Sequence, residues 1–342
     1  MSARNCEVLI IGAGLAGISA ARTLHAAGVD VLLLDKGRSV GGRMATRRIG
    51  NGAADHGAQF FTVASPEFQR TVDGWEADGF AFLWDIGWST GSITGNEGEN
   101  HTRYAIAGGM NRLMKHLATD IPTETSVRIV AVRHAETGWE AEADNGQIYT
   151  GAGLILTAPP PQSLALLEAG NVPLTAMDAE ILGRLHYSPA LTGIFRIEGK
   201  VTIPSPGAVH RPAEPLPWIA DNQQKGVSPD ETVVTINSNG DYAQRYWDAP
   251  EVEILETMKA TLAHYLAPGS RVVESQVQRW RYAFPRHTHS QPTLRTSGTR
   301  PLFFAGDAFQ GPLVEGAWLS GAAAAAGLLG DADFLAARQT RQ

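Results

Sequence analysis

Three glycines near the start of the chain, Gly12, Gly14 and Gly17, have the spacing of a turn that binds a dinucleotide. They follow an apolar run, residues 8–11, and a stretch of small residues comes after them. The first glycine of such a turn allows a tight bend, the second lets backbone N–H groups approach a pyrophosphate, and the third lets the following helix pack closely on the strand. Asp35 lies 23 residues after Gly12, near the offset of roughly 20 residues at which a carboxylate reaches a ribose hydroxyl. The spacing therefore predicts a dinucleotide site.

Two further segments favour FAD over NAD as that dinucleotide. A glycine pair ending at Gly42, followed by Arg43, comes soon after the first motif. Near the far end, an apolar run ends in Gly306 and Asp307, and a helix is predicted to begin at Glu315. A carboxylate in that place can accept hydrogen bonds from ribityl or ribose hydroxyls, and a helix N-terminus favours negative charge on a group above it. A strand, turn and helix without a ligand is the alternative, but the pairing with the first motif favours FAD.

The composition is that of a globular protein and restricts the partners. The chain has 342 residues, enough for two domains, of which 43% are hydrophobic and 18% charged. A net charge of −7 gives no general attraction to nucleic acid or an anionic membrane. No apolar run approaches the roughly 20 residues that span a bilayer, and Glu7 interrupts the apolar start that resembles a secretory signal. We therefore expect a cytoplasmic protein with neither nucleic acid nor membrane as a partner.

The single cysteine, Cys6, excludes an internal disulfide and a cysteine-based zinc site. We expect it to be a small packing residue at the edge of the first strand. No metal ligands are predicted elsewhere in the chain.

The predicted elements divide into a cofactor domain and a substrate domain. Residues 1–62 predict a strand, a helix over 15–27 stopped by Gly28, a second strand and a glycine-rich basic loop. The later elements of this domain are a helix from about 110 to 118, an antiparallel meander over 126–149, a strand over 153–158 stopped by prolines, a strand over 301–307 and a helix over 315–329. We assign residues 1–62, 105–160 and 275–342 to the FAD-binding domain.

Residues 63–104 and 161–274 are assigned to the substrate domain. The first segment is rich in aromatic residues and then breaks into turns over 90–100. Its aromatic residues are Phe68, Trp75, Phe80, Phe82, Trp84 and Trp88. The second segment predicts helices over 164–168 and 251–267, and strands over 190–197, 216–220 and 232–237. Strands bracketed by helices, without regular alternation, predict an α+β domain beside the α/β cofactor domain.

Taken together, these motifs resemble the flavin amine oxidase superfamily, and within it the bacterial renalase-like proteins. The resemblance covers essentially the whole chain. The superfamily resemblance rests on residues 12–17, Asp35, 41–43, 306–307 and 315–316, and it is densest in these cofactor segments. Residues 55–62 (DHGAQFFT), 278–282 (QRWRY) and 314–321 (VEGAWLSG) carry the narrower resemblance to renalase-like proteins. It implies a Rossmann-like FAD-binding domain built from discontinuous segments and a sheet-based substrate domain.

The resemblance also implies the residues that bind FAD, without a covalent link. Arg43 is expected near the pyrophosphate, residues 58–60 near the flavin ring, and the backbone of Val127 near the adenine. The full set is Gly12, Gly14, Leu15, Ala16, Gly17, Asp35, Lys36, Gly42, Arg43, Met44, Ala58, Gln59, Phe60, Val127, Gly306, Asp307, Glu315, Gly316, Ala317 and Ser320.

Renalase-like enzymes oxidise misplaced-hydride isomers of NAD(P)H, the 2- and 6-dihydronicotinamides, to NAD(P)+, and oxygen is then reduced to hydrogen peroxide. Hydride transfer to a flavin needs a ring stacked at short range and little acid–base help, so no catalytic side chain is predicted. The candidates for the substrate pocket are Asn222, Trp280, Tyr282 and His56. For Trp280, a place in the core is an equal alternative.

Two observations bear on the substrate in opposite directions. Many amine oxidase relatives carry a lysine in the substrate-domain strand near the flavin, whereas residues 190–195 contain none. Renalase-like sequences often place a histidine late in the strand aligned with 232–237, and Ile236 stands there. An amine or amino-acid-like substrate, or a flavin-binding protein without turnover, therefore stays open beside the dihydronicotinamide. The electron acceptor and the oligomeric state stay open as well.

Overall fold

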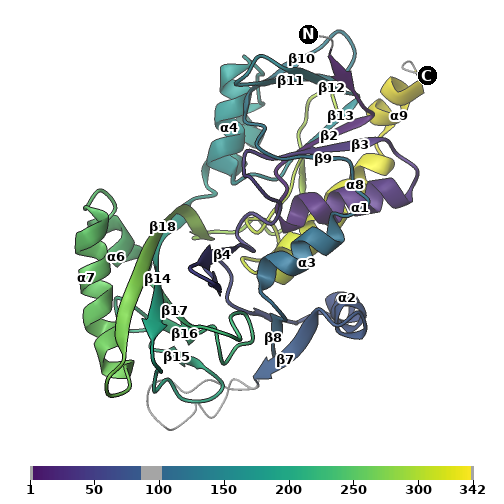
Figure 1. The fold of residues 1–342 in the computed structure, drawn as a ribbon. Helices are drawn as coiled ribbons and strands as arrows, with labels where there is room; N and C mark the ends of the chain where they lie inside the picture. The colour runs from purple at the N-terminus through teal and green to yellow at the C-terminus, as the bar shows by residue number, and fades with distance from the viewer. Residues whose placement is uncertain (1–2, 86–101, 340–342) are drawn as a thin grey trace. The chain divides into compact units, whose positions relative to one another are not determined.

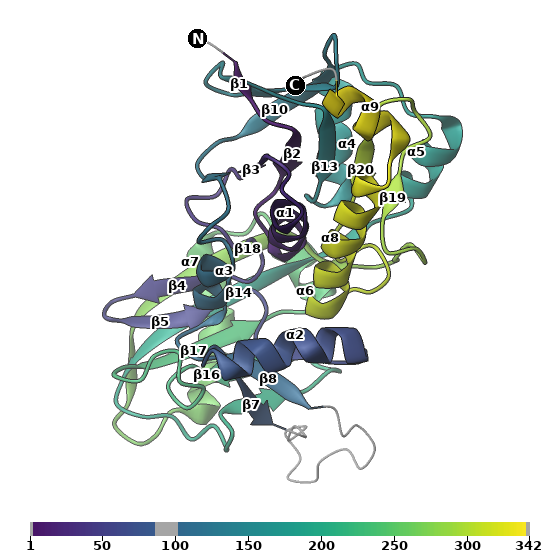
Figure 2. The same cartoon turned by 90° about the vertical axis from the view of Figure 1, so that its right-hand side faces the viewer.

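The computed structural model describes residues 3–85 and 102–339, so Trp88 and the turns expected over 90–100 lie outside the described residues. The chain forms two compact units, each assembled from separate segments. The first comprises Met1–Gly42, Met114–His186 and Pro285–Gln342, and the second comprises Arg43–Leu113 and Tyr187–Phe284. Figures 1 and 2 colour the chain from the N- to the C-terminus. The α/β character of the first unit and the sheet-based second unit confirm the predicted fold class.

A six-stranded sheet forms the centre of the first unit, in the order β19-β20-β13-β2-β3-β9. The strands are β2 (Val8–Ile11), β3 (Val31–Leu34), β9 (Thr123–Glu124), β13 (Gly153–Leu156), β19 (Leu294–Arg295) and β20 (Leu302–Phe304). All neighbours are parallel except β19 and β20. β2, β3 and β13 are buried at every residue, as continuous apolar runs are in a parallel sheet covered on both faces.

Two helices of small residues, α1 (Leu15–Ala26) and α8 (Val314–Leu329), lie side by side in the first unit (Figure 2). A Cβ added to Gly321 would overlap the backbone oxygen of Ala16, and the Ser19 hydroxyl donates to the Trp318 carbonyl at 2.7 Å. Small side chains therefore permit this close approach. Among the described helices, none alone is long and apolar enough to cross a bilayer; α8 and α9 (Ala332–Gln339) would qualify only as a pair bent by 62°.

The predicted antiparallel meander is confirmed as β10 (Ile129–His134), β11 (Trp139–Ala143) and β12 (Ile148–Gly151), with β1 (Arg4–Asn5) parallel to β12. Its first strand begins three residues later than predicted, because Ser126 has a positive φ of 61° and leaves the extended conformation. Two helices complete the unit, α4 (Pro160–Ala169) and α5 (Ala176–Gly183). The prolines predicted only to stop a strand also occupy the first turn of α4, where their missing N–H is not needed. No helix was predicted at α5.

A five-stranded sheet forms the second unit, in the order β15-β16-β17-β14-β18. Its strands are β14 (Tyr187–Glu198), β15 (Ala208–His210), β16 (Trp218–Asp221), β17 (Thr232–Asn237) and β18 (Arg271–Pro285). One face packs on α6 (Gly240–Arg245) and α7 (Glu251–Leu262), which a short 3-10 turn (Ala263–Tyr265) follows (Figure 1). β17 has the predicted bounds. β18 was not predicted as a strand, because this edge strand is mostly polar and partly exposed.

The segment predicted as a cofactor loop forms instead a hairpin of β4 (Thr46–Ile49) and β5 (Gly52–Asp55) in the second unit. Ile49 and Ala54 pack in a buried cluster with Ile194 and Val233 of the large sheet. This packing explains why the compact unit takes in residues 43–62, which the domain assignment placed with the cofactor. The remaining elements are β6 (Phe61–Thr62), α2 (Pro66–Ala77), β7 (Ala81–Asp85), β8 (Arg103–Ile106) and α3 (Met110–Leu117).

Candidate functional site

The glycine turn leads directly into the N-terminus of α1, and its three glycines serve different purposes. Gly12 has a φ of +112°, and an added Cβ would lie 2.5 Å from the Thr157 hydroxyl oxygen. A Cβ on Gly17 would overlap the carbonyl oxygen of Gly12. Gly14 differs, because its φ is an ordinary −77° and no heavy atom of the described residues lies within 4 Å of the Cβ position. Two glycines are therefore required by packing, and the third borders open space.

That open space lies at the first turn of a helix whose backbone donors are available. The N-cap residue of α1 is Gly14, which has no side chain to accept from the first turn, so the amides there, which include those of Leu15 and Ala16, are suited to donate to a ligand. Such an uncapped, positively polarised end is suited to the pyrophosphate of FAD. The cradle at Gly14 therefore fits the cofactor that the sequence predicts.

The second glycine pair lies against the first turn, as the predicted site requires. The Gly41 N–H donates to the Ala13 carbonyl at 2.8 Å. Gly42 has a φ of +53°, and a Cβ there would lie 3.3 Å from the Cα of Gly14. Lys36, by contrast, is exposed and its ammonium donates to the Gln162 side chain at 3.1 Å.

Asp35 holds the backbone around this turn. One carboxylate oxygen accepts from the Ala13 N–H and the other from the Gly37 N–H, both at 2.6 Å. An ionised carboxylate has about four acceptor sites, so capacity for a ribose hydroxyl remains. The Val127 N–H donates to the Asp35 carbonyl at 2.9 Å, which leaves the Val127 carbonyl as the backbone group suited to an adenine.

At the C-terminal motif, two of the predicted ligands make contacts within the protein. Ser320 is fully buried and its hydroxyl accepts from the Gly306 N–H at 2.9 Å. A Cβ on Gly316 would overlap the Gly311 carbonyl oxygen. Ser320 thus fixes the bend at Gly306, whose φ is +142°, and Gly316 allows the preceding loop to approach α8, while contact of either residue with FAD stays a prediction. Asp307 is buried, while Glu315 and Ala317 lie in the first turns of α8.

In the second unit, the segment that follows β5 turns sharply beside Arg43. The Ala58 N–H donates to the Arg43 carbonyl at 2.8 Å, and a Cβ on Gly57 would overlap that same oxygen. The Arg43 guanidinium donates to the Ala283 carbonyl of β18 at 3.2 Å and lies 5.5 Å from the centre of the Tyr187 ring. Arg43 is therefore held by backbone and side-chain contacts within its own unit.

Two buried polar atoms of this segment have no hydrogen-bond partner among the described residues. Gln59 is 6% exposed, and its amide nitrogen donates to the carbonyls of Asp55 and Gly57 while Oε1 stays unsatisfied. Nδ1 of His56 is the second such atom. A buried polar atom without a hydrogen bond costs free energy. A ligand group that hydrogen-bonds to these two atoms would remove that cost. Of the other predicted FAD contacts in this unit, Met44 is buried, and Phe60 packs on Trp84 and Trp218.

His56 and Trp280, two of the four pocket candidates, lie together. Their rings stack with centroids 5.3 Å apart, and the indole N–H donates to the His56 carbonyl at 2.8 Å. Burial, and to a smaller extent the Arg47 charge, lower the pKa of His56 to about 4 against the opposing effect of the Asp55 charge. His56 is therefore neutral near pH 7.

The other two candidates behave differently. Asn222 is fully buried, and its amide accepts from the Asp55 N–H and donates to the Val233 carbonyl and the Thr235 hydroxyl. These bonds make the side chain an anchor for Asp55 and β17, and its place in the pocket stays a prediction. Tyr282 is half-buried and meets the Tyr187 ring edge-on at 6.0 Å.

The strand register shows which face of the sheet Ile236 occupies. Ile236 is fully buried in the core cluster on the side of α6 and α7. Its neighbour Asn237 points to the opposite face, where its side-chain oxygen accepts from the Thr192 hydroxyl at 2.9 Å. The same hydroxyl lies 3.2 Å from the His56 carbonyl. Asn237 and Thr192, which the sequence did not single out, therefore share the face of His56.

Lys225 is another residue that the sequence analysis missed. Its ammonium lies 2.7 Å from the Asp55 carboxylate, and both side chains are fully buried. Burial lowers the pKa of Lys225, and the Asp55 charge opposes the shift. A lone lysine in a polar turn carries no sequence signal of burial. Among the described residues, no group of His, Cys, Asp and Glu could hold a metal ion.

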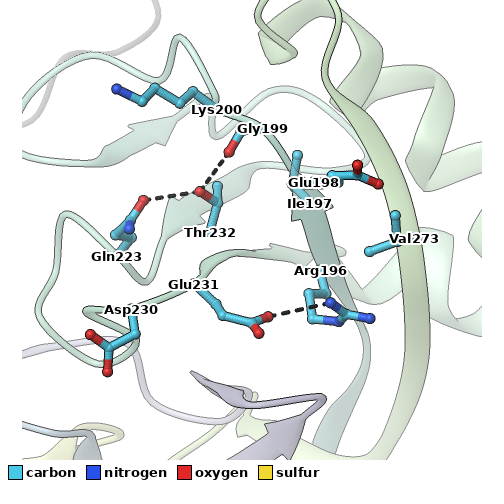
Figure 3. Close-up of a pocket in the computed structure, with 10 residues that line it drawn as sticks. All are labelled: Arg196, Ile197, Glu198, Gly199, Lys200, Gln223, Asp230, Glu231, Thr232 and Val273. Atoms are coloured by element: carbon cyan, nitrogen blue, oxygen red, sulfur yellow. Dashed lines mark hydrogen bonds and ion pairs between the residues drawn. The ribbon is translucent and has the colours of Figure 1, made fainter.

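Two depressions lie in the surface of the described residues, and only one of them is lined by a residue predicted to bind FAD. One, of about 480 Å3 in the second unit, has charged walls in which Arg196 pairs with Glu231 (Figure 3). None of its lining residues was predicted, and we assign it no role. The other, of about 580 Å3 in the first unit, includes Val127 beside Glu124 and Tyr149. It adjoins the residue expected near the adenine.

Comparison with known proteins gives the following matches. A model of NAD(P)-binding Rossmann-like domains matches residues 10–75, and a model of flavin-containing amine oxidoreductases matches residues 79–329. Hydroxyneurosporene desaturase of Rubrivivax gelatinosus is 38% identical over 60 residues, which are 18% of this chain and 11% of that protein.

The structure is similar to that of wild-type putrescine oxidase bound to putrescine. The TM-score is 0.72 over 96% of this chain and 100% of that one, at 15% sequence identity. A triple mutant of putrescine oxidase gives a TM-score of 0.71 with the same coverage. At this identity the likeness establishes the fold alone.

Proposed function

Because this chain belongs to the flavin-containing amine oxidoreductase family, we propose that it is an FAD-dependent oxidase of the renalase type. Its substrate is a 2- or 6-dihydro isomer of NAD(P)H, and its product is NAD(P)+. Bound FAD supplies the hydride acceptor, and oxygen takes up the two electrons and becomes hydrogen peroxide. The side chains bind and orient the reactants.

Four residues of the first unit are proposed to hold FAD. The open cradle at Gly14 and the uncapped first turn of α1 bind the pyrophosphate. Asp35 accepts a hydrogen bond from the ribose with its remaining lone pairs, and the Val127 carbonyl meets the adenine. Asp307 is proposed for the ribityl hydroxyls.

In the second unit, residues 58–60 are proposed to contact the isoalloxazine ring. The unsatisfied Oε1 of Gln59 can accept a hydrogen bond from a ring N–H. Arg43, held by Ala283 and Tyr187, is proposed to compensate pyrophosphate charge. These assignments need no covalent link to the cofactor.

One observation carries the choice of a dihydronicotinamide over an amine: among the described residues, none on the face of β14 and β17 beside His56 is an available base. This face presents Thr192 and Asn237, β14 contains no lysine, and Lys225 is occupied by Asp55. An ammonium substrate must lose a proton before oxidation, whereas a dihydropyridine gives up hydride without one. A neutral, poorly basic His56 suits the second reaction.

The proposed ring pocket uses the stacked pair of His56 and Trp280. Stacked aromatic surfaces favour a flat pyridine ring, and Nδ1 of His56 can accept from a carboxamide NH2. The Asn237 amide nitrogen is proposed as the donor to the carboxamide oxygen, since its own oxygen already faces Thr192.

Stopped-flow mixing of the purified holoenzyme with 2-dihydro-NAD(P) tests the proposal. We expect near-stoichiometric bleaching of the oxidised flavin absorbance and release of NAD(P)+. Ordinary NADH serves as the matched control and should bleach the flavin much more slowly. The 6-dihydro isomer is tested in the same way. A flavin that stays oxidised with both isomers would exclude this function.

The second candidate is an amine or amino-acid-like substrate, which the family itself favours. A substrate panel of amines, with peroxide production as the readout, separates the two candidates. Turnover of an amine at a rate above that of the dihydronicotinamides would replace the first proposal.

A further inference from the structure

Asp55 and Lys225 form an ion pair in a place where ion pairs are uncommon. Both side chains are fully buried, and the ammonium lies 2.7 Å from Oδ2. Lys225 also lies 5.1 Å from the centre of the Trp84 ring. Taking two charges out of water costs about as much as their attraction returns, so hydrophobic residues of similar size would give comparable stability. The reason for the pair should therefore be sought in geometry.

Asp55 collects directional bonds from several separate elements of the second unit. Its Oδ1 accepts from the Thr46 hydroxyl at 2.6 Å and from the Met110 N–H, at the start of α3, at 2.8 Å. Its backbone N–H donates to Asn222, and its carbonyl accepts from the Thr235 hydroxyl at 2.9 Å. With Lys225 these contacts fix both the side chain and the backbone of Asp55.

Asp55 lies at the start of the short segment that carries the two unsatisfied polar atoms, Nδ1 of His56 and Oε1 of Gln59. His56 follows Asp55 in the chain, and Gln59 donates its amide N–H to the Asp55 carbonyl at 2.8 Å. The position of Asp55 therefore determines how Nδ1 of His56 and Oε1 of Gln59 are oriented. A small rotation of Asp55 would displace both atoms together.

We propose that Asp55 and Lys225 are positioning residues, which set the His56–Gln59 turn at the geometry that the flavin ring requires. The pair itself touches neither cofactor nor substrate; it acts through Gln59 and His56. The inference rests on the ring contacts proposed above, but not on the identity of the substrate.

Three variants test the pair in the holoenzyme: Lys225→Met, Asp55→Asn and the double variant. Each is measured for its melting temperature without FAD, its FAD dissociation constant, and the absorbance spectrum and midpoint potential of its bound flavin. We expect Lys225→Met to raise the FAD dissociation constant about tenfold or more, as loss of a supporting contact does at other sites. We also expect it to shift the flavin spectrum and potential.

The double variant separates positioning from stability. It leaves no unpaired buried charge, so the melting temperature should recover relative to Lys225→Met. The flavin defect should persist, because the bond that orients Asp55 is still missing. Recovery of melting temperature and flavin properties together would overturn the proposal. Because none of these readouts uses a substrate, they are unaffected if the dihydronicotinamide proposal fails.

A control and a milder variant complete the design. Arg196→Gln breaks the partly exposed pair with Glu231 in the same unit and should leave FAD binding and the flavin spectrum unchanged. Thr235→Val removes the hydroxyl that donates to the Asp55 carbonyl and accepts from the Asn222 amide, with little change in volume, and covers the case in which Lys225→Met does not fold. A folded Thr235→Val or Lys225→Met protein with wild-type FAD affinity, spectrum and potential would refute the positioning role.

Discussion

The glycine turn of the first unit and the His56–Phe60 segment of the second are both assigned to FAD, but they obtain their geometry in different ways. Around Gly12 and Gly17 the shape is dictated by the backbone, because Gly12 has a φ of +112° and a Cβ on Gly17 would overlap the Gly12 carbonyl oxygen. Around His56 it is dictated by hydrogen bonds that converge on Asp55 from distant parts of the unit. A backbone-determined site is visible in sequence, whereas a network-determined site becomes visible only in three dimensions.

The largest effect is expected for a substitution in the glycine turn that prevents FAD binding but leaves folding intact. Gly14→Val should abolish FAD retention, because the side chain occupies the space proposed for the pyrophosphate, and should leave folding intact, because the space is empty of protein atoms. The flavin-to-protein ratio from visible absorbance and the circular dichroism spectrum are the measurements. Gly74→Val, at an open glycine of α2, is the control. A yellow Gly14→Val protein of wild-type stoichiometry contradicts the placement.

The next effect concerns the network-determined segment and its pH dependence. The folded state holds the pKa of His56 at about 4, against 6.5 for the unperturbed group. The unfolded chain therefore binds more protons between these values, so this contribution to stability is complete above pH 6.5 and is lost as pH falls toward 4. It amounts to about 3 kcal/mol at most, from 1.4 kcal/mol for each pKa unit.

His56→Phe keeps a ring for stacking on Trp280 and removes the titrating group. Urea unfolding at pH 7 and pH 4.5 should show a smaller loss of stability for the variant than for the wild type. Equal losses in the two proteins would mean that His56 does not contribute to the pH dependence.

Gly17→Ala tests the packing role of the third glycine. The new Cβ overlaps the Gly12 carbonyl, so we expect a loss of about 2 kcal/mol, even though alanine is the better helix former. Thermal unfolding of the FAD-free protein measures it. Gly74→Ala in α2 should be neutral or stabilising. If Gly17→Ala were as stable as the wild type, this turn would not be determined by backbone contact.

The smallest effect concerns one hydrogen bond of the network. Trp280→Phe removes the N–H that donates to the His56 carbonyl and keeps an aromatic ring for the stack. The loss should be about 1 kcal/mol, because Thr192 remains as a second donor. Urea unfolding gives the value. A loss several times larger would show that the indole does more than orient the segment.

This difference also explains what the sequence could and could not predict. The turn at Gly12–Gly17, strand β17 and helix α8 follow from local spacing and periodicity, and they are confirmed. β18 escaped prediction because an edge strand needs no apolar alternation. The β4–β5 hairpin escaped because its glycines and arginines are equally typical of a loop.

The candidate site shows the same contrast between local and distant determinants. The sequence singled out Gly14, His56 and residues 58–60, and it predicted ligand contacts for Ser320 and Asn222, whose polar atoms also bind protein. Lys225 gave no signal, since its burial depends on Asp55, 170 positions away in sequence. Side-chain roles that depend on partners so distant cannot be read from local patterns.

The central sheet of the first unit pairs β13 with β2 on one side and with β20 on the other. During synthesis on the ribosome, the segment that forms β20 emerges only after the whole of the second unit's sequence has been made. The sheet and the α1–α8 packing therefore cannot form until β20 and α8 have been synthesised, as expected for a fold dominated by distant pairings. A chain terminated before residue 302 would be unable to build this sheet.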